Sequence, residues 1–133
     1  MRVSLRAVAI IVLCLGAAVT STAQEGHPLK GSWIGVWQGN EAHGDSIVVI
    51  LDWDGRAVSG IINPGTDNID IASVDLDPED WTVRIEASGE DDAGKRLNYV
   101  IDGEIQDLAL PSRSIVGRWR HQDGSGSFEI SRQ

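Results

Sequence analysis

Short runs of alternating apolar and polar residues fill the sequence after Lys30, and Gly, Asp, Asn or Pro interrupts them at intervals of about ten residues. Successive side chains of a β-strand point to opposite faces, so this alternation predicts strands with one buried and one exposed face. A helical apolar period does not persist for three turns anywhere in this region. The pattern therefore predicts an all-β domain, either a sandwich or a barrel.

Eight segments carry the alternation, and short clusters of turn residues separate them. About eight strands make a closed barrel that side chains can fill or that can hold one small ligand. Because every connection is short, we expect sequential strands to be neighbours, and Asp54-Gly55 predicts a two-residue type I′ turn. The predicted fold is a single up-and-down antiparallel β-barrel of about eight strands, preceded by a cleaved signal helix. The predicted strands are 32–38, 46–53, 57–62, 69–76, 81–87, 97–105, 114–120 and 127–132.

The parity of the apolar residues assigns one face of each predicted strand to the barrel interior. This parity changes within segment 69–76, because Ile69 and Ile71 are odd-numbered whereas Val74 and Leu76 are even-numbered. One extra residue in the strand would keep all four side chains on the same face. The change of parity therefore predicts a β-bulge near Ala72.

The N-terminal residues have the order of a secretory signal peptide. Arg2 and Arg6 precede an apolar run at 7–19, and small residues follow up to Ala23. The apolar run is shorter than the roughly 20 residues that a membrane-spanning helix needs. We therefore expect a signal peptide at 1–23, an N-terminal tail at 24–30 and the barrel domain at 31–133. The expected location is secreted or periplasmic, with no membrane association after cleavage.

The charge balance limits the classes of partner. The chain has 11 Lys and Arg against 20 Asp and Glu; Arg2 and Arg6 lie in the predicted signal peptide and every acidic residue follows it, so the charge after cleavage is 9 − 20 = −11. Such a surface repels phosphate backbones and anionic headgroups, so we expect no nucleic-acid partner. The sole cysteine, Cys14, also lies in the predicted signal peptide, so the cleaved chain forms no disulfide.

The first and last predicted strands each carry a distinctive residue near the same end of the barrel. Gly31-Ser32-Trp33 opens the first strand, and Arg132 closes the last. This layout resembles the calycins, the group of lipocalin and avidin barrels, and also bacterial secreted lipocalin-like domains of unknown function. The resemblance implies that Trp33 closes the barrel base with Arg132 packed over its ring, a cation–π contact. Arg113 is a second candidate for the same ring face.

The resemblance implies binding in general and no particular ligand. Aromatic side chains on inward faces either fill the core or line the mouth of a cup. In the second case a small apolar molecule would be the ligand. The residues predicted to line that cup are Trp37, Trp53, Trp81 and Tyr99.

Catalytic and metal signatures are not evident in the sequence. His27, His43 and His121 share no spacing typical of metal ligands. The sequence has no Gly-x-Ser-x-Gly nucleophile elbow, and no cysteine after the predicted signal peptide. We therefore expect no enzymatic activity, no metal and no cofactor.

The outer faces of the first three predicted strands are unusually apolar. Exposed apolar patches commonly mark an interface, so a structural or protein-interaction module is the alternative to a ligand-binding barrel. Its partner would be a second copy of the chain or another exported protein. In a further alternative, the tail at 24–30 folds back over the patch. The predicted interface residues are Ile34, Val36, Val48, Ile50 and Ile61.

Overall fold

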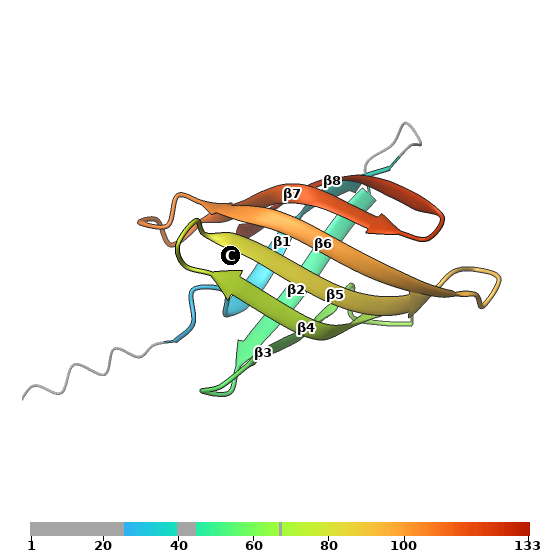
Figure 1. Cartoon of the computed structure of the whole chain (residues 1–133), viewed down its shortest axis with the longest axis horizontal. Coiled ribbons are helices and arrows are strands. Elements are labelled where there is room, and N and C mark those ends of the chain that lie inside the picture. The colour runs from blue at the N-terminus through green and yellow to red at the C-terminus, as the bar shows by residue number, and fades with distance from the viewer. Residues whose placement is uncertain (1–25, 40–44, 67) are drawn as a thin grey trace, which may run out of the picture.

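The computed structural model describes residues 26–39, 45–66 and 68–133, and eight antiparallel strands in it close into one barrel (Figure 1). This confirms the predicted all-β, up-and-down barrel. The predicted signal helix lies outside the described residues. The described part of the chain contains no helix long and apolar enough to cross a membrane. The strands are β1 (Gly31–Gln38), β2 (Asp45–Trp53), β3 (Val58–Ile62), β4 (Ile69–Asp77), β5 (Thr82–Glu90), β6 (Arg96–Gln106), β7 (Ser114–His121) and β8 (Gly124–Arg132).

Each strand pairs with the next, and β8 pairs back onto β1. The closing register places Trp33 opposite Arg132 and Trp37 opposite Phe128. Closure satisfies the backbone of the first and last strands, which would otherwise be open sheet edges. In Figure 1, β1 and β2 lie behind β5 and β6, so these strand pairs form opposite walls of the barrel.

The predicted bulge in β4 is confirmed. The register between β4 and β5 shifts between Ile71 and Ser73, so that Ala72 is the extra residue. As a result, Val74 and Leu76 pack against the core together with Ile71, despite their different parity.

The turn between β2 and β3 differs from the prediction. Trp53 pairs with Val58, so four residues form the turn instead of two. Gly55 has a positive φ of 95°, whereas Asp54 does not. The Asp54 carboxylate accepts hydrogen bonds from the Arg56 and Ala57 amides, both at 2.8 Å. The Asp54 side chain thus pairs with the backbone amides of a four-residue turn, which the Asp-Gly pair alone does not predict.

Residues 26–30 close one end of the barrel. Leu29 and Trp33 are both fully buried in the core, with 0% of their surfaces exposed. The predicted tail therefore belongs to the packed fold through Leu29. We refer to this end as the base, and to the end at which β1 finishes and β2 begins as the mouth.

Glycines let neighbouring strands approach closely in the walls. Gly117 of β7 lies opposite Gly103 of β6, and a Cβ on Gly117 would overlap the carbonyl oxygen of Asp102. Gly35 meets the Glu129 carbonyl of β8 in the same way. Interior strand glycines of this kind mark tight bends in a barrel wall.

Candidate functional site

Among the described residues, apolar side chains pack into the interior of the barrel. A void of about 20 Å³ remains between them, and its lining includes Trp37, Trp119 and Phe128. A void of that size accommodates about one water molecule, whereas small-molecule sites usually have volumes of roughly 300 Å³ or more. This void would therefore hold an apolar ligand only if the side chains around it moved.

Four aromatic rings pack together at the mouth. Trp37 stacks on Tyr99 with ring centroids 6.2 Å apart, and Trp119 lies 5.6 Å from Trp37. His121 packs edge-on against Tyr99 at 5.1 Å. Burial raises the pKa of the Tyr99 hydroxyl, and the negative charge of Asp91 raises it further. The cluster thus favours a neutral tyrosine at the entrance to the core.

The other two residues of the predicted cup lie at the base. Trp53 ends β2 and packs against His27, with ring centroids 4.8 Å apart. Trp81 immediately precedes β5, and its carbonyl accepts a hydrogen bond from the Ile105 amide. The structure therefore brings Trp37 together with Tyr99 and places Trp53 and Trp81 at the opposite end of the barrel.

Both arginines predicted to compete for Trp33 bind the chain segment that closes the base. The Arg132 Nε donates to the Lys30 carbonyl at 2.9 Å, and an Arg113 Nη donates to the Pro28 carbonyl at 3.1 Å. Arg132 is also the Cα partner of Trp33 across β8 and β1. These bonds tie residues 26–30 to the last two strands. A contact of either guanidinium with the face of the Trp33 ring stays a prediction.

The register brings the five predicted interface residues together on the outer wall of β1–β3. Ile34 lies opposite Val48, and Ile50 lies opposite Ile61. Ile34 and Val36 are each 46% exposed, and Ile50 is 40% exposed. We call these five side chains the apolar wall. Leaving such a patch in water forfeits about 25 cal/mol for each Å² that a partner would cover.

Acidic residues border the apolar wall. Asp70 of β4 is the partner of Ile61, and Glu129 of β8 is the partner of Val36. Asp52 continues β2 on the same face beyond Ile50. All three acids are exposed. Among the ion pairs of the described residues, one involves this border: Lys30 lies 3.9 Å from Asp52.

The alternative in which the tail covers the apolar wall is wrong for Leu29, the large apolar residue of that segment. Leu29 is buried in the core and is not on the outside of the barrel. Gln24 and Glu25 lie outside the described residues.

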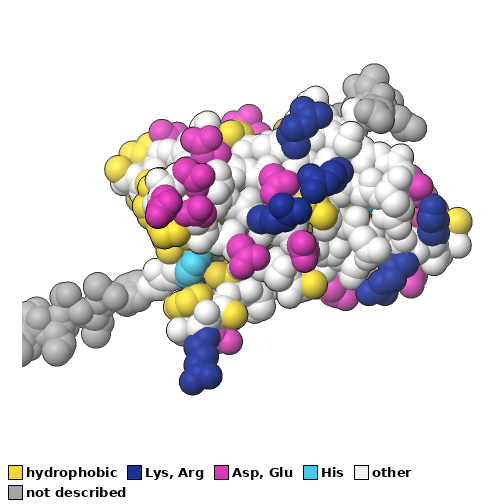
Figure 2. Space-filling model, in the orientation of Figure 1, with side chains coloured by type: hydrophobic (Ala, Val, Ile, Leu, Met, Phe, Trp, Pro, Cys, Tyr) yellow, Lys and Arg dark blue, Asp and Glu magenta, His cyan; other side chains and the backbone are white. Residues whose placement is uncertain are grey.

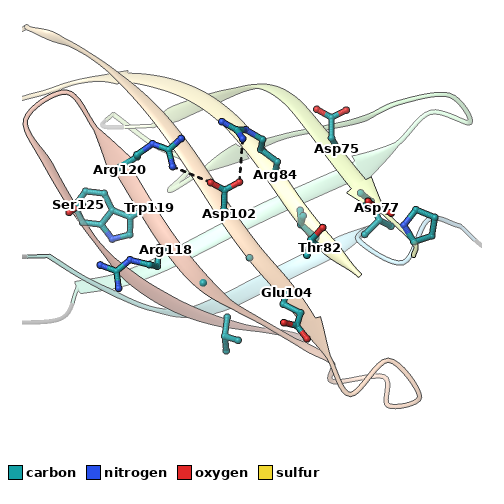
Figure 3. Close-up of a pocket in the computed structure, with 16 residues that line it drawn as sticks. Asp75, Asp77, Thr82, Arg84, Asp102, Glu104, Arg118, Trp119, Arg120 and Ser125 are labelled. Carbon is teal, nitrogen blue, oxygen red and sulfur yellow. Dashed lines mark hydrogen bonds and ion pairs between the residues drawn. The ribbon is translucent and has the colours of Figure 1, made fainter. Parts of the chain in front are cut away.

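A groove of about 930 Å³ runs across the opposite wall, over β4–β7. Figure 2 shows basic and acidic side chains side by side on this wall. In Figure 3, Asp102 lies between Arg84 and Arg120, and Arg118 extends from β7, the same strand as Arg120. The backbone of the facing Gly103 and Gly117 forms part of the groove lining. This groove was not predicted from the sequence, although Arg84, Arg118 and Arg120 have the parity of outward-facing residues on β5 and β7.

Within the described residues, no three His, Cys, Asp or Glu side chains are arranged to hold a metal ion. The Asp54 carboxylate, for example, is held by the two turn amides that also lower its pKa. No protein-family model matches this chain, and no curated protein matches it significantly.

Proposed function

We propose that this chain is an exported, non-catalytic protein-interaction module, and that its apolar wall binds the partner. The observation that carries the proposal is the grouping of five apolar side chains on the outer face of β1–β3. The signal-peptide pattern at 1–23 supports export. The small interior void supports an external binding surface over an internal one.

The border of the apolar wall specifies the chemistry of the partner. Asp52, Asp70 and Glu129 surround the apolar centre, so a matching surface presents an apolar ridge flanked by Lys or Arg. A second copy bound through the same wall would place these acids opposite one another. Like charges at an interface oppose binding, which favours a foreign partner over a symmetric dimer.

Site-specific photo-cross-linking in the cells that produce the protein tests this proposal. A photoreactive residue at Val36 reports on the apolar wall, and one at Asn98 reports on the opposite wall, where this side chain is exposed on β6. We expect a cross-linked partner from Val36 and none from Asn98. Mass spectrometry of the cross-linked peptide should find an apolar segment next to Lys or Arg.

Two matched substitutions and the salt dependence complete the test. Ile50→Lys should abolish the complex, whereas Asn98→Lys, which adds the same charge to the other wall, should leave it intact. Salt should weaken the complex, because it screens attraction between opposite charges. Equal cross-linking at both positions would contradict the proposal. A complex of twice the chain mass whose affinity increases with salt would mean that the partner is a second copy of the chain and not a foreign protein.

A further inference from the structure

The groove over β4–β7 carries nearly balanced charge. Three arginines and four acids line it, Asp75, Asp77, Asp102 and Glu104 being the acids, which gives a formal sum of 3 − 4 = −1. A groove with this balance is matched to neither a simple anion nor a simple cation. The two signs are nevertheless separated in space: Figure 3 shows Arg118 and Arg120 toward one end of the groove and Asp77 and Glu104 toward the other.

Asp102 divides the arginines into paired and unpaired groups. Its Oδ2 lies 3.2 Å from Arg120 and its Oδ1 lies 3.8 Å from Arg84, so both carboxylate oxygens have an arginine partner. Arg118 is the Cα partner of Asp102 on β7, yet it makes no ion pair within the described part of the chain. Glu104 likewise has no cationic partner among the described residues. The groove thus offers one unpaired cation and, two residues along β6 from Asp102, one unpaired anion.

Sheet geometry sets the separation of these two charges. Arg118 lies opposite Asp102, and Glu104 is one strand away and two residues further along. With about 4.8 Å between strands and about 3.3 Å per residue, their Cα atoms are roughly 8 Å apart. An extended tripeptide, at about 3.3 to 3.6 Å per residue, spans roughly 10 Å. Flexible Arg and Glu side chains accommodate the difference.

We propose that this groove binds short peptides with two free termini. The terminal carboxylate contacts Arg118, with Arg120 beside it, and the terminal ammonium contacts Glu104, with Asp77 beyond it. The backbone of Gly103 and Gly117 lies between these two ends, and the side chain of Val116 lies beside Glu104, its Cα partner. These groups contact the peptide backbone and small side chains. The inference is independent of the proposed function, because the groove and the apolar wall lie on opposite sides of the barrel.

Trialanine and its capped forms test the proposal with the full chain after the predicted signal peptide. Backbone amide NMR shifts locate the site, and their dependence on peptide concentration gives Kd. Trialanine with free termini should shift the amides of Gly103 and Gly117 at millimolar concentration. Capping either terminus should weaken binding by about tenfold, and capping both should remove it.

Charge-removing variants assign each terminus. In Arg118→Gln, trialanine and its C-terminal amide should bind equally, and in Glu104→Gln, trialanine and its N-acetyl form should bind equally. Arg56→Gln, which removes an exposed arginine from the β2–β3 turn outside the groove, should bind like the wild type. The proposal is overturned if free trialanine shifts no groove amide, or if the fully capped peptide binds as tightly as the free one.

Discussion

The indole Nε1 of Trp33 donates a hydrogen bond to the carbonyl oxygen of Leu29 at 2.8 Å, and both residues are completely buried. A bond between fully buried groups leaves a desolvated donor or acceptor if either partner is lost. Because Leu29 precedes β1, this bond fixes the chain segment that closes the base. The Arg113 and Arg132 bonds to Pro28 and Lys30 hold the same segment from the last two strands.

The first prediction concerns the stability of the base. Trp33→Ala should lower the free energy of unfolding by about 3–5 kcal/mol, and Leu29→Ala by about 2–5 kcal/mol, because both create buried cavities. Urea unfolding would measure both changes. Ile34→Ala is the control, since Ile34 lies on the outer face and should cost much less. A Leu29→Ala protein as stable as the wild type would show that residues 26–30 do not belong to the folded unit.

The second prediction concerns the close approach of β6 and β7. A Cβ on Gly117 would overlap the backbone carbonyl of Asp102, which moves only if the strand shifts. Gly117→Ala should therefore destabilise the barrel by about 1–3 kcal/mol, the usual cost of overpacking. Ser127→Ala on the neighbouring β8 is the control, because Ser127 is exposed. If thermal unfolding gives equal midpoints for the two variants, the strands have room that the structure does not show.

The sequence allowed all eight strands and the β4 bulge to be predicted, because alternation is a local property of the chain. The parity of Ile69, Ile71, Val74 and Leu76 reports directly which side chains share a face. The same parity placed Ile34, Val36 and Ile50 outside the barrel. To join these residues into one patch, it is also necessary to know which strands are neighbours. In an up-and-down barrel each strand pairs with the next one along the chain.

Other features depend on contacts that alternation does not encode. Parity puts Trp37 and Trp53 on inward faces. Strand direction and register, however, place Trp37 at the mouth and Trp53 at the base. Leu29 stands in a stretch too short to show a pattern, so its burial was missed. The placement of the guanidinium groups of Arg113 and Arg132 depends on side-chain rotamers, which the sequence does not specify.

The third prediction concerns pH. His27 packs on Trp53, and burial lowers the pKa of its imidazole below the ordinary value of 6.5. Its Nδ1 accepts a hydrogen bond from the Leu29 amide, which requires that nitrogen to be unprotonated. The unfolded chain therefore binds the proton more readily, so the stabilising contribution is complete above pH 6.5 and is lost as the pH falls through the lower, folded-state pKa.

Replacing His27 should remove this contribution to the pH dependence. In His27→Asn the side-chain carbonyl can still accept the Leu29 amide bond, but the group no longer titrates. We expect the decrease in unfolding free energy between about pH 8 and about pH 5 to be smaller in the variant than in the wild type. Denaturant unfolding at each pH gives the two slopes. Identical slopes would mean that the folded state does not favour the neutral form of the His27 imidazole.

The last prediction concerns access to the barrel interior. Trp37 and Trp119 line the end of a void of about 20 Å³ whose other walls are almost entirely apolar. Trp37→Ala should join the space of the lost ring to this void and produce an apolar cavity, since packed cores relax only partly around a deleted side chain. Cavities with apolar walls bind molecules such as benzene.

Benzene binding should therefore appear in Trp37→Ala and be absent from the wild type. Fluorescence of the remaining tryptophans, with Trp119 beside the new cavity, would report it. Trp53→Ala is the matched control, because it removes an indole from the opposite end, where the ring contacts His27 and not the void. Stoichiometric binding by the wild type would instead show that the mouth rings move aside. The barrel would then act as a carrier of apolar molecules, and Trp37 and Tyr99 would be its gate.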